Sequence, residues 1–273
     1  MSELETKEQF LREELRKAPS LIVAYSGGVD SAYLAYAAHQ VLGERMLAVT
    51  ALSASYSSRD RHEAEGMVTR FKFPHEFIET DELSDPNYRA NNPDRCYFCK
   101  DAMFVRLQEL AAQRGFAAIA YGINVDDKGD WRPGQRAAQE HQIKTPLLEA
   151  GLTKADIREL ARRAELPVWD RPASACLSSR IAYGLEVTPE RLAVIEKGEE
   201  ALRGLGFRQM RVRHHDQMVR IEIAPDELPQ ALTSDMARKF VEIFKALGFK
   251  FVALDLEGYR TGSLNTHLVS LKK

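Results

Sequence analysis

The residues with the clearest chemistry form one short motif, SGGVDS at residues 26–31, which follows an apolar run and precedes a helical pattern. The pattern predicts a buried strand at 21–25 that turns directly into a helix at 32–42. Glycine lets the backbone approach a phosphate closely, and the free N–H groups at a helix start attract its charge. Asp30 would hold Mg²⁺ against the phosphates. The plain alternative is a Gly-Gly turn without a ligand. The candidate phosphate-binding residues are Ser26, Gly27, Gly28, Asp30 and Ser31.

A second polar segment, YGINVDDKGDWRPG at residues 121–134, follows a strand predicted at 116–121. Its aspartates are suited to bind Mg²⁺ or to orient an amine or a water, and its arginine to contact a phosphate. A solvated acidic turn is the plain alternative. Because ligands of parallel sheets bind at the carboxyl ends of the strands, we expect this segment on the same edge as the first motif. The candidates are Gly122, Asp126, Asp127, Asp130 and Arg132.

The three cysteines are Cys96 and Cys99, in a Cys-x-x-Cys pair at the start of a predicted helix, and Cys176 in an irregular loop. A redox dithiol needs only the pair, whereas structural zinc usually takes a fourth ligand. A sacrificial or nucleophilic thiol needs only Cys176. Three thiolates without a fourth ligand suit a [4Fe–4S] cluster that has one open iron. Three small buried side chains are the plain alternative.

The order of the elements predicts two domains of different class. In residues 1–170, short apolar strands alternate with helices, which predicts an α/β domain with a parallel sheet and helices on both faces. Residues 171–187 are rich in Ser, Pro and Ala and predict an active-site loop or linker. Residues 188–273 predict a smaller α+β domain, with helices at 188–205 and 231–247 and strands at 207–214, 218–224 and 251–256.

Charged residues of the second domain alternate along two predicted strands. Arg211 and Arg213 share one strand face, and Arg220 and Glu222 share a face of the next. Paired guanidinium groups can clamp a phosphate or a carboxylate, although a solvated strand face is as common. We place the neighbouring residues 214–215, both histidines, in an exposed hairpin turn without a role.

The composition limits the class of protein. The chain has 273 residues, with 38 Lys and Arg against 40 Asp and Glu, and a formal net charge of −2. This balance disfavours nucleic-acid binding through the overall field and favours a small substrate. The odd cysteine count, the polar start of the chain and the lack of a long apolar run predict a cytoplasmic protein that does not contact membranes.

Together these motifs resemble a known family. SGGVDS resembles the phosphate loop of N-type ATP pyrophosphatases, the PP-loop enzymes, and residues 122–134 are similar to a segment found in several of them. With the loop at 173–180 and the pair Arg211 and Arg213, almost the whole chain resembles the LarE-type sulfur-insertion enzymes of nickel-pincer nucleotide biosynthesis, which serve lactate racemase. The resemblance implies an adenine nucleotide α-hydrolase-like fold.

The resemblance implies an enzyme, an ATP-dependent sulfurtransferase that releases AMP and pyrophosphate. It would adenylate the carboxylates of pyridinium-3,5-biscarboxylic acid mononucleotide and replace AMP with sulfur, which gives thiocarboxylates. Family members take the sulfur from a sacrificed loop cysteine or from a [4Fe–4S] cluster on three cysteines. The Cys-x-x-Cys pair, which the sacrificial kind lacks, makes this sequence resemble the cluster kind. The sulfide donor is unknown, and the resemblance implies a homo-oligomer.

The same resemblance assigns a role to each candidate residue. ATP, with Mg²⁺, is bound by Ser26, Gly27, Gly28, Asp30, Ser31, Gly122, Asp126 and Arg132. The catalytic candidates are Asp30, Asp127 and Cys176. The cluster ligands are Cys96, Cys99 and Cys176. The substrate is bound by Ser179, Arg180, Arg211, Arg213 and Glu222.

Two other functions stay open at the level of sequence. A tRNA-thiolating PP-loop enzyme also uses a Cys-x-x-Cys pair with a later cysteine, but the net charge and the lack of a basic arm disfavour it. An ATP-binding protein whose cysteines hold structural zinc would transfer no sulfur.

Overall fold

The computed structural model describes residues 2–127, 133–172, 175–260 and 262–265. The chain forms two compact units, one comprising Met1–Glu82 and Cys96–Ser174 and the other Leu83–Arg95 and Ala175–Lys273. The short segment 83–95 therefore belongs with the C-terminal part of the chain, which the linear pattern does not reveal. None of the helices in the described ranges is long and apolar enough to cross a membrane.

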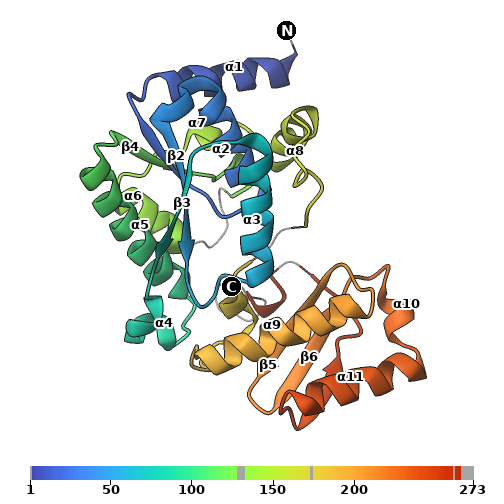
Figure 1. The fold of residues 1–273 in the computed structure, drawn as a ribbon. Coiled ribbons are helices and arrows are strands. Elements are labelled where there is room, and N and C mark those ends of the chain that lie inside the picture. Colours follow the sequence, from blue (N-terminus) through green and yellow to red (C-terminus); the bar gives the residue numbers. More distant parts are fainter. Residues whose placement is uncertain (1, 128–132, 173–174, 261, 266–273) are drawn as a thin grey trace, which may run out of the picture. The chain divides into compact units, whose positions relative to one another are not determined.

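The first unit is built on a parallel sheet with the strand order β3-β2-β1-β4 (Figure 1), which confirms the predicted α/β class. Its strands are β1 (Leu21–Ala24), β2 (Met46–Leu52), β3 (His75–Glu79) and β4 (Ala118–Tyr121). The chain moves outward from β1 to β3 and then returns to β4 on the other side of β1. The loops after β1 and β4 therefore flank a switch point, where sheets of this kind bind ligands.

Helices cover both faces of this sheet because β1 is apolar on both sides. Leu21 and Val23 pack into one core cluster, and Ile22 and Ala24 pack into another. The first cluster also includes residues of α1 (Glu3–Arg16), α2 (Val29–Leu42), α3 (Ser58–Phe71) and α8 (Lys154–Arg163). The second includes residues of α5 (Arg95–Arg114) and α6 (Pro133–Glu140). The remaining short helix of this unit is α7 (Pro146–Glu149).

The second unit contains a three-stranded sheet with the order β5-β6-β7, antiparallel between β5 and β6 and parallel between β6 and β7. Its elements are α4 (Pro86–Arg89), α9 (Pro189–Gly204), β5 (Met210–His215), β6 (Met218–Ile223), α10 (Leu228–Ala231), α11 (Ser234–Ala246) and β7 (Phe251–Leu254). The helix predicted at 231–247 is thus divided, because Thr233 begins a new helix by accepting a hydrogen bond from the Met236 N–H.

Candidate active site

The SGGVDS motif forms the turn from β1 into α2, as its pattern predicted. Gly28 is the N-cap of α2 and provides no side-chain cap, so the first N–H groups of the helix remain available to a ligand. Gly27 has a φ of +76°, a conformation that other residues rarely adopt. The Gly28 N–H makes only a long bond of 3.4 Å to Ser26 Oγ. The turn therefore has the features of an anion-binding loop.

The loop after β4 lies directly against this turn, and Gly122 makes the contact. A Cβ on Gly122 would come within 2.8 Å of the Ser31 main-chain nitrogen, so no larger residue fits without a backbone shift. Asn124, two residues on, donates from Nδ2 to Asp30 Oδ2 at 3.3 Å. The structure thus brings the first part of the second predicted segment to the first motif.

Asp30 is the most unusual carboxylate of this region. Its Oδ2 receives the Lys154 ammonium at 2.6 Å, whereas its Oδ1 is buried without a hydrogen-bond partner among the described residues. Burial raises the pKa of Asp30, and Asp127 adds to this, while Lys154 and Asn124 oppose it. An orphaned buried carboxylate oxygen costs free energy, which a bound cation such as Mg²⁺ would recover. The geometry therefore fits a metal at Asp30.

Lys154 is a residue that the sequence analysis did not select. It is the first residue of α8, and its main-chain N–H donates to Asp126 Oδ2 at 2.7 Å. A cation at a helix N-terminus opposes the helix dipole, so it needs a nearby anion. That unfavourable placement after the N-cap Thr153 is the signal that would have identified it. Asp127 is buried, and its Oδ2 accepts from the Asn124 N–H at 3.0 Å.

The remaining part of the second segment reaches the Cys-x-x-Cys turn. A Cβ on Gly134, in α6, would come within 2.8 Å of Lys100 Cγ and 3.3 Å of the Cys96 carbonyl oxygen. Cys96 is exposed and Cys99 half-buried in the first turns of α5. The predicted ligands Asp130 and Arg132 lie outside the described residues.

Cys176, in the second unit, lies in a loop held by charged side chains. Burial disfavours its thiolate, but Arg95, the Ser178 hydroxyl and Arg180 outweigh this and lower the pKa of the thiol. Cys96, Cys99 and Cys176 form no disulfide with one another. Within the described ranges no group of three or more His, Cys, Asp or Glu side chains is arranged to hold a metal ion.

Arg180 serves the Cys176 loop in this structure. Its buried guanidinium forms an ion pair with Glu199 at 2.9 Å and donates to the carbonyl oxygens of Ala175 and Cys176. Arg95 holds the same loop by donating to the Ser178 carbonyl at 2.8 Å. Sequence reasoning predicted a substrate-binding Arg180. These contacts show that Arg180 also holds the backbone around the Cys176 thiol in place.

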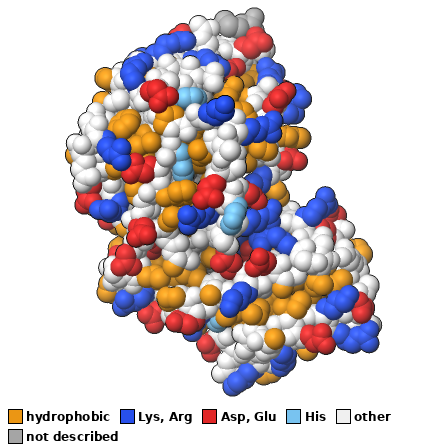
Figure 2. Space-filling view, in the orientation of Figure 1, with side chains coloured by type: hydrophobic (Ala, Val, Ile, Leu, Met, Phe, Trp, Pro, Cys, Tyr) orange, Lys and Arg blue, Asp and Glu red, His pale blue; other side chains and the backbone are white. Residues whose placement is uncertain are grey.

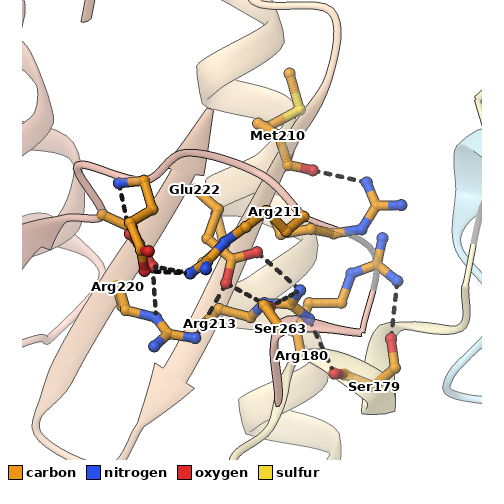
Figure 3. A network of polar contacts seen from close by, with 12 residues as sticks. Ser179, Arg180, Met210, Arg211, Arg213, Arg220, Glu222 and Ser263 are labelled. Carbon is orange, nitrogen blue, oxygen red and sulfur yellow. Dashed lines mark hydrogen bonds and ion pairs between the residues drawn. The ribbon is translucent and has the colours of Figure 1, made fainter. Parts of the chain in front are cut away.

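Figure 3 shows the arginine face of the small sheet, formed by Arg211 and Arg213 of β5 and Arg220 and Glu222 of β6. Arg213 points toward Glu222. Arg213 donates to Glu222 at 2.8 Å and to the Ser179 carbonyl at 3.2 Å. Ser263, from the C-terminal segment, bridges the pair, accepting from Arg213 at 2.9 Å and donating to Glu222 at 2.7 Å. Sequence reasoning missed Ser263 because a lone serine in a polar stretch carries no signal.

The arginine face holds more positive charge than its fully buried Glu222 can neutralise. Arg213 and Arg220 both donate to Glu222, and each has a buried Nε without a hydrogen-bond partner in the described part of the chain. Arg211 is also buried and lies over the Tyr259 ring at 4.9 Å. Burial, followed by the neighbouring Arg180, lowers its pKa. Clustered and partly unsatisfied guanidinium groups favour an anionic ligand.

The two histidines of β5 are placed differently from the prediction. His214 and His215 are the last residues of the strand, and His214 is buried, not exposed in the turn. Burial lowers the pKa of His214 to about 4.

Acidic and basic side chains alternate over the molecular face drawn in Figure 2, and no region of a single sign dominates it. This agrees with the balanced composition of the chain.

Comparison with known proteins supports one family. A family model described as NAD synthase matches residues 3–103, the part that contains β1, the glycine-rich turn and α2. Pyridinium-3,5-bisthiocarboxylic acid mononucleotide synthase of Lactiplantibacillus plantarum is 35% identical over 98% of this chain and 97% of its own length. The chain belongs to this synthase family.

Other relatives define how far the likeness extends. An uncharacterised protein of Synechocystis is 40% identical over 96% of this chain and 98% of its own length. A tRNA-specific 2-thiouridylase of Rickettsia felis is 26% identical over 58% of the chain and 53% of its own length. The likeness to the synthase therefore includes the second unit, whereas the likeness to the thiouridylase covers only part of the chain.

Proposed function

We propose that the protein is an ATP-dependent sulfurtransferase that converts pyridinium-3,5-biscarboxylic acid mononucleotide into its thiocarboxylate form. The observation that carries this proposal is the match over nearly the full length to a synthase of the bisthiocarboxylic product. In the first step a substrate carboxylate attacks the α-phosphorus of ATP and pyrophosphate leaves. In the second step sulfur attacks the carbonyl carbon of the acyl adenylate and AMP leaves.

At the ATP end, the N–H groups that begin α2 take the phosphates, with the hydroxyls of Ser26 and Ser31 as further donors. Asp30 and Asp127 would hold Mg²⁺, which would supply positive charge to the phosphates and to the leaving pyrophosphate. The buried and unpartnered Asp30 Oδ1 supports this assignment. Lys154 pairs with Asp30 Oδ2 at 2.6 Å and leaves Oδ1 to the metal. The other members of the ATP site are Gly27, Gly28, Gly122, Asp126 and Arg132.

At the substrate end, the arginine face of the second unit takes the phosphate of the mononucleotide. Arg211 and Arg213 supply the positive charge, and the buried Nε of Arg213 supports an additional anionic partner. Ser179 and Arg180 complete the site, and Glu222 keeps Arg213 in its rotamer through the bond at 2.8 Å.

For the sulfur step, we propose that Cys96, Cys99 and Cys176 hold a [4Fe–4S] cluster. Three thiolates are the donor set of a cluster with one open iron, and the Arg95 and Arg180 guanidinium groups favour the thiolate of Cys176. When bound, such a cluster would supply sulfur at its open iron. Because Cys176 belongs to a different unit from the other two thiols, the proposal depends on their chemistry and spacing.

The test is substrate-dependent release of AMP and pyrophosphate by anaerobically reconstituted protein. We expect both products and a mass gain on the substrate, and no release without the pyridinium nucleotide; the absence of any substrate-dependent AMP would refute the assigned reaction. Replacing Cys96, Cys99 or Cys176 by Ala should remove the iron–sulfur absorbance. Iron binding that survives Cys176→Ala would exclude Cys176 as a ligand, and zinc without iron would favour a structural metal.

A tRNA-thiolating activity is the second candidate, because a thiouridylase matches 58% of the chain. A gel shift with tRNA that weakens steeply with salt would support it. A cytoplasmic homo-oligomer stays a prediction.

A further inference from the structure

One charged cluster in the first unit has no role in the steps above. Arg171, in the segment after α8, forms ion pairs with Asp60 and Glu63 of α3. The side chains of Arg171 and Asp60 are only 14% and 13% exposed, so the pair is largely withdrawn from water. Glu63 also pairs with the exposed Arg59 at 2.6 Å. A largely buried ion pair such as Arg171 with Asp60 is costly unless its geometry serves a purpose.

The cluster lies against the outer side of the phosphate loop. Arg171 NH1 donates to the Gly27 carbonyl oxygen at 3.5 Å, and the Tyr56 hydroxyl donates to the Ser26 carbonyl oxygen at 3.1 Å. In a trans peptide the C=O and the following N–H point in opposite directions. Holding the carbonyls of residues 26 and 27 therefore directs the N–H groups of Gly27 and Gly28 to the opposite side, toward a phosphate.

The main chain at residues 169–171, which carries Arg171, is itself held by the first unit. Arg158 of α8 donates to the carbonyl oxygens of Trp169 at 2.7 Å and Arg171 at 2.6 Å. The main chain on both sides of Asp170 is therefore held by one guanidinium. The Arg171 side chain approaches the loop from a rigid base, which a positioning contact requires.

The charges give Arg171 a second effect on a polyanion. Asp60 and Glu63 are two carboxylates close to a loop that must accept ATP, and Arg171 compensates one of them. Arg59 also pairs with Glu63 at 2.6 Å, so the loss of Arg171 would leave one negative charge in excess in this partly desolvated region near the phosphates. Its loss should therefore weaken ATP binding by misdirecting the loop and by exposing negative charge.

We propose that Arg171 is a positioning residue of the ATP site, which orients and electrostatically shields the phosphate loop through Gly27, Asp60 and Glu63. The inference depends on the proposed ATP-binding role of residues 26–31.

The experiment compares Arg171→Met, Arg171→Lys and the control Arg61→Met, which removes an exposed ion pair of α3 with Glu65. ATP affinity and KM for ATP are measured together with the thermal midpoint. We expect Arg171→Met to raise KM for ATP about tenfold or more, the effect of losing one charged hydrogen bond, while the control stays within about twofold of the wild type.

Arg171→Lys keeps the charge but cannot span all three partners, so it should fall between Met and the wild type. The double variant Arg171→Met/Glu63→Gln should recover part of the loss because it removes one negative charge along with the positive one and so restores the charge balance of the cluster. A folded Arg171→Met with unchanged KM overturns the inference; if that variant does not fold, an unchanged KM in Arg171→Lys does so. A wild-type protein that binds no ATP refutes the proposed function instead.

Discussion

Replacing Lys154 by Met is the most direct test of the ATP site. The change removes the cation that lies 2.6 Å from Asp30 but keeps an unbranched side chain at the start of α8. Asp30 then faces the phosphate loop as an uncompensated carboxylate, held only by the 3.3 Å bond from Asn124. ATP must bind against this charge, so its affinity should fall.

The size of the effect follows from the charges. An uncompensated Asp30 carboxylate and a phosphate charge about 4 Å apart would repel by roughly 4 kcal/mol at an effective dielectric constant of about 20, which is the energy that the Lys154 charge offsets. The Lys154 side chain is 33% exposed and Asp30 is 18% exposed, so water screens part of this interaction. We therefore expect a loss of about 2 kcal/mol, which is about thirtyfold in kcat/KM for ATP.

The assay is pyrophosphate release at varied ATP concentration and saturating pyridinium nucleotide. The matched control is Lys7→Met, which breaks the 3.0 Å ion pair between Lys7 of α1 and Asp156 of α8, away from the loop. Lys154→Arg keeps the charge and should recover most of the activity. If Lys154→Met is folded and its kcat/KM for ATP stays within about threefold of the wild type, the reasoning is wrong.

Three further predictions concern other parts of the molecule. Gly122→Ala should lower ATP-dependent activity by about tenfold or more, since its Cβ would lie 2.8 Å from the Ser31 nitrogen. Gly66→Ala is the control, because a Cβ on Gly66 enters open space, and equal activities of the two variants would contradict the predicted effect of the Gly122 contact. Arg213→Met should raise KM for the pyridinium nucleotide about tenfold or more and leave KM for ATP unchanged. Arg208→Met, at an exposed site, is the control and should change neither KM. An unchanged KM for the pyridinium nucleotide in Arg213→Met would exclude Arg213 from the substrate site. Burial lowers the pKa of His75 to about 4, so protonation favours the unfolded chain and stability falls as the pH drops from about 6.5 to 4. Between pH 7 and pH 5, the free energy of unfolding measured in urea should fall by about 1–2 kcal/mol less in His75→Gln than in the wild type. Identical decreases would exclude His75 as a contributor to the pH dependence of stability.

Much of the first unit could be predicted because its determinants are local. The apolar run 21–25 can only be buried on both faces, and two glycines before a helix leave its first N–H groups free. The β4 loop was expected at the same sheet edge, and Gly122 lies there against Ser31.

The failures of prediction concern where helices and strands end and which side chains are buried. The division of the helix at 231–247 follows from a local cap at Thr233 that apolar periodicity hides. His214 looked like a turn residue, but its strand extends one residue further and its side chain turns toward the core. Strand ends and burial depend on which face a neighbouring element covers, and sequence periodicity alone does not specify this.

The sequence by itself determined which reactive and ligand-binding groups the chain contains: a phosphate loop, a second acidic segment, three thiols and alternating arginines. Only the tertiary structure decided which side chains compensate one another. Lys154 reaches Asp30 across 124 residues because the return of the chain to β4 places the start of α8 beside the loop after β1. Arg171 reaches Gly27 across 144 residues in the same way. Charge pairing acts over a few ångströms in space, whatever the separation along the chain, so these contacts exist only once the sheet order is set.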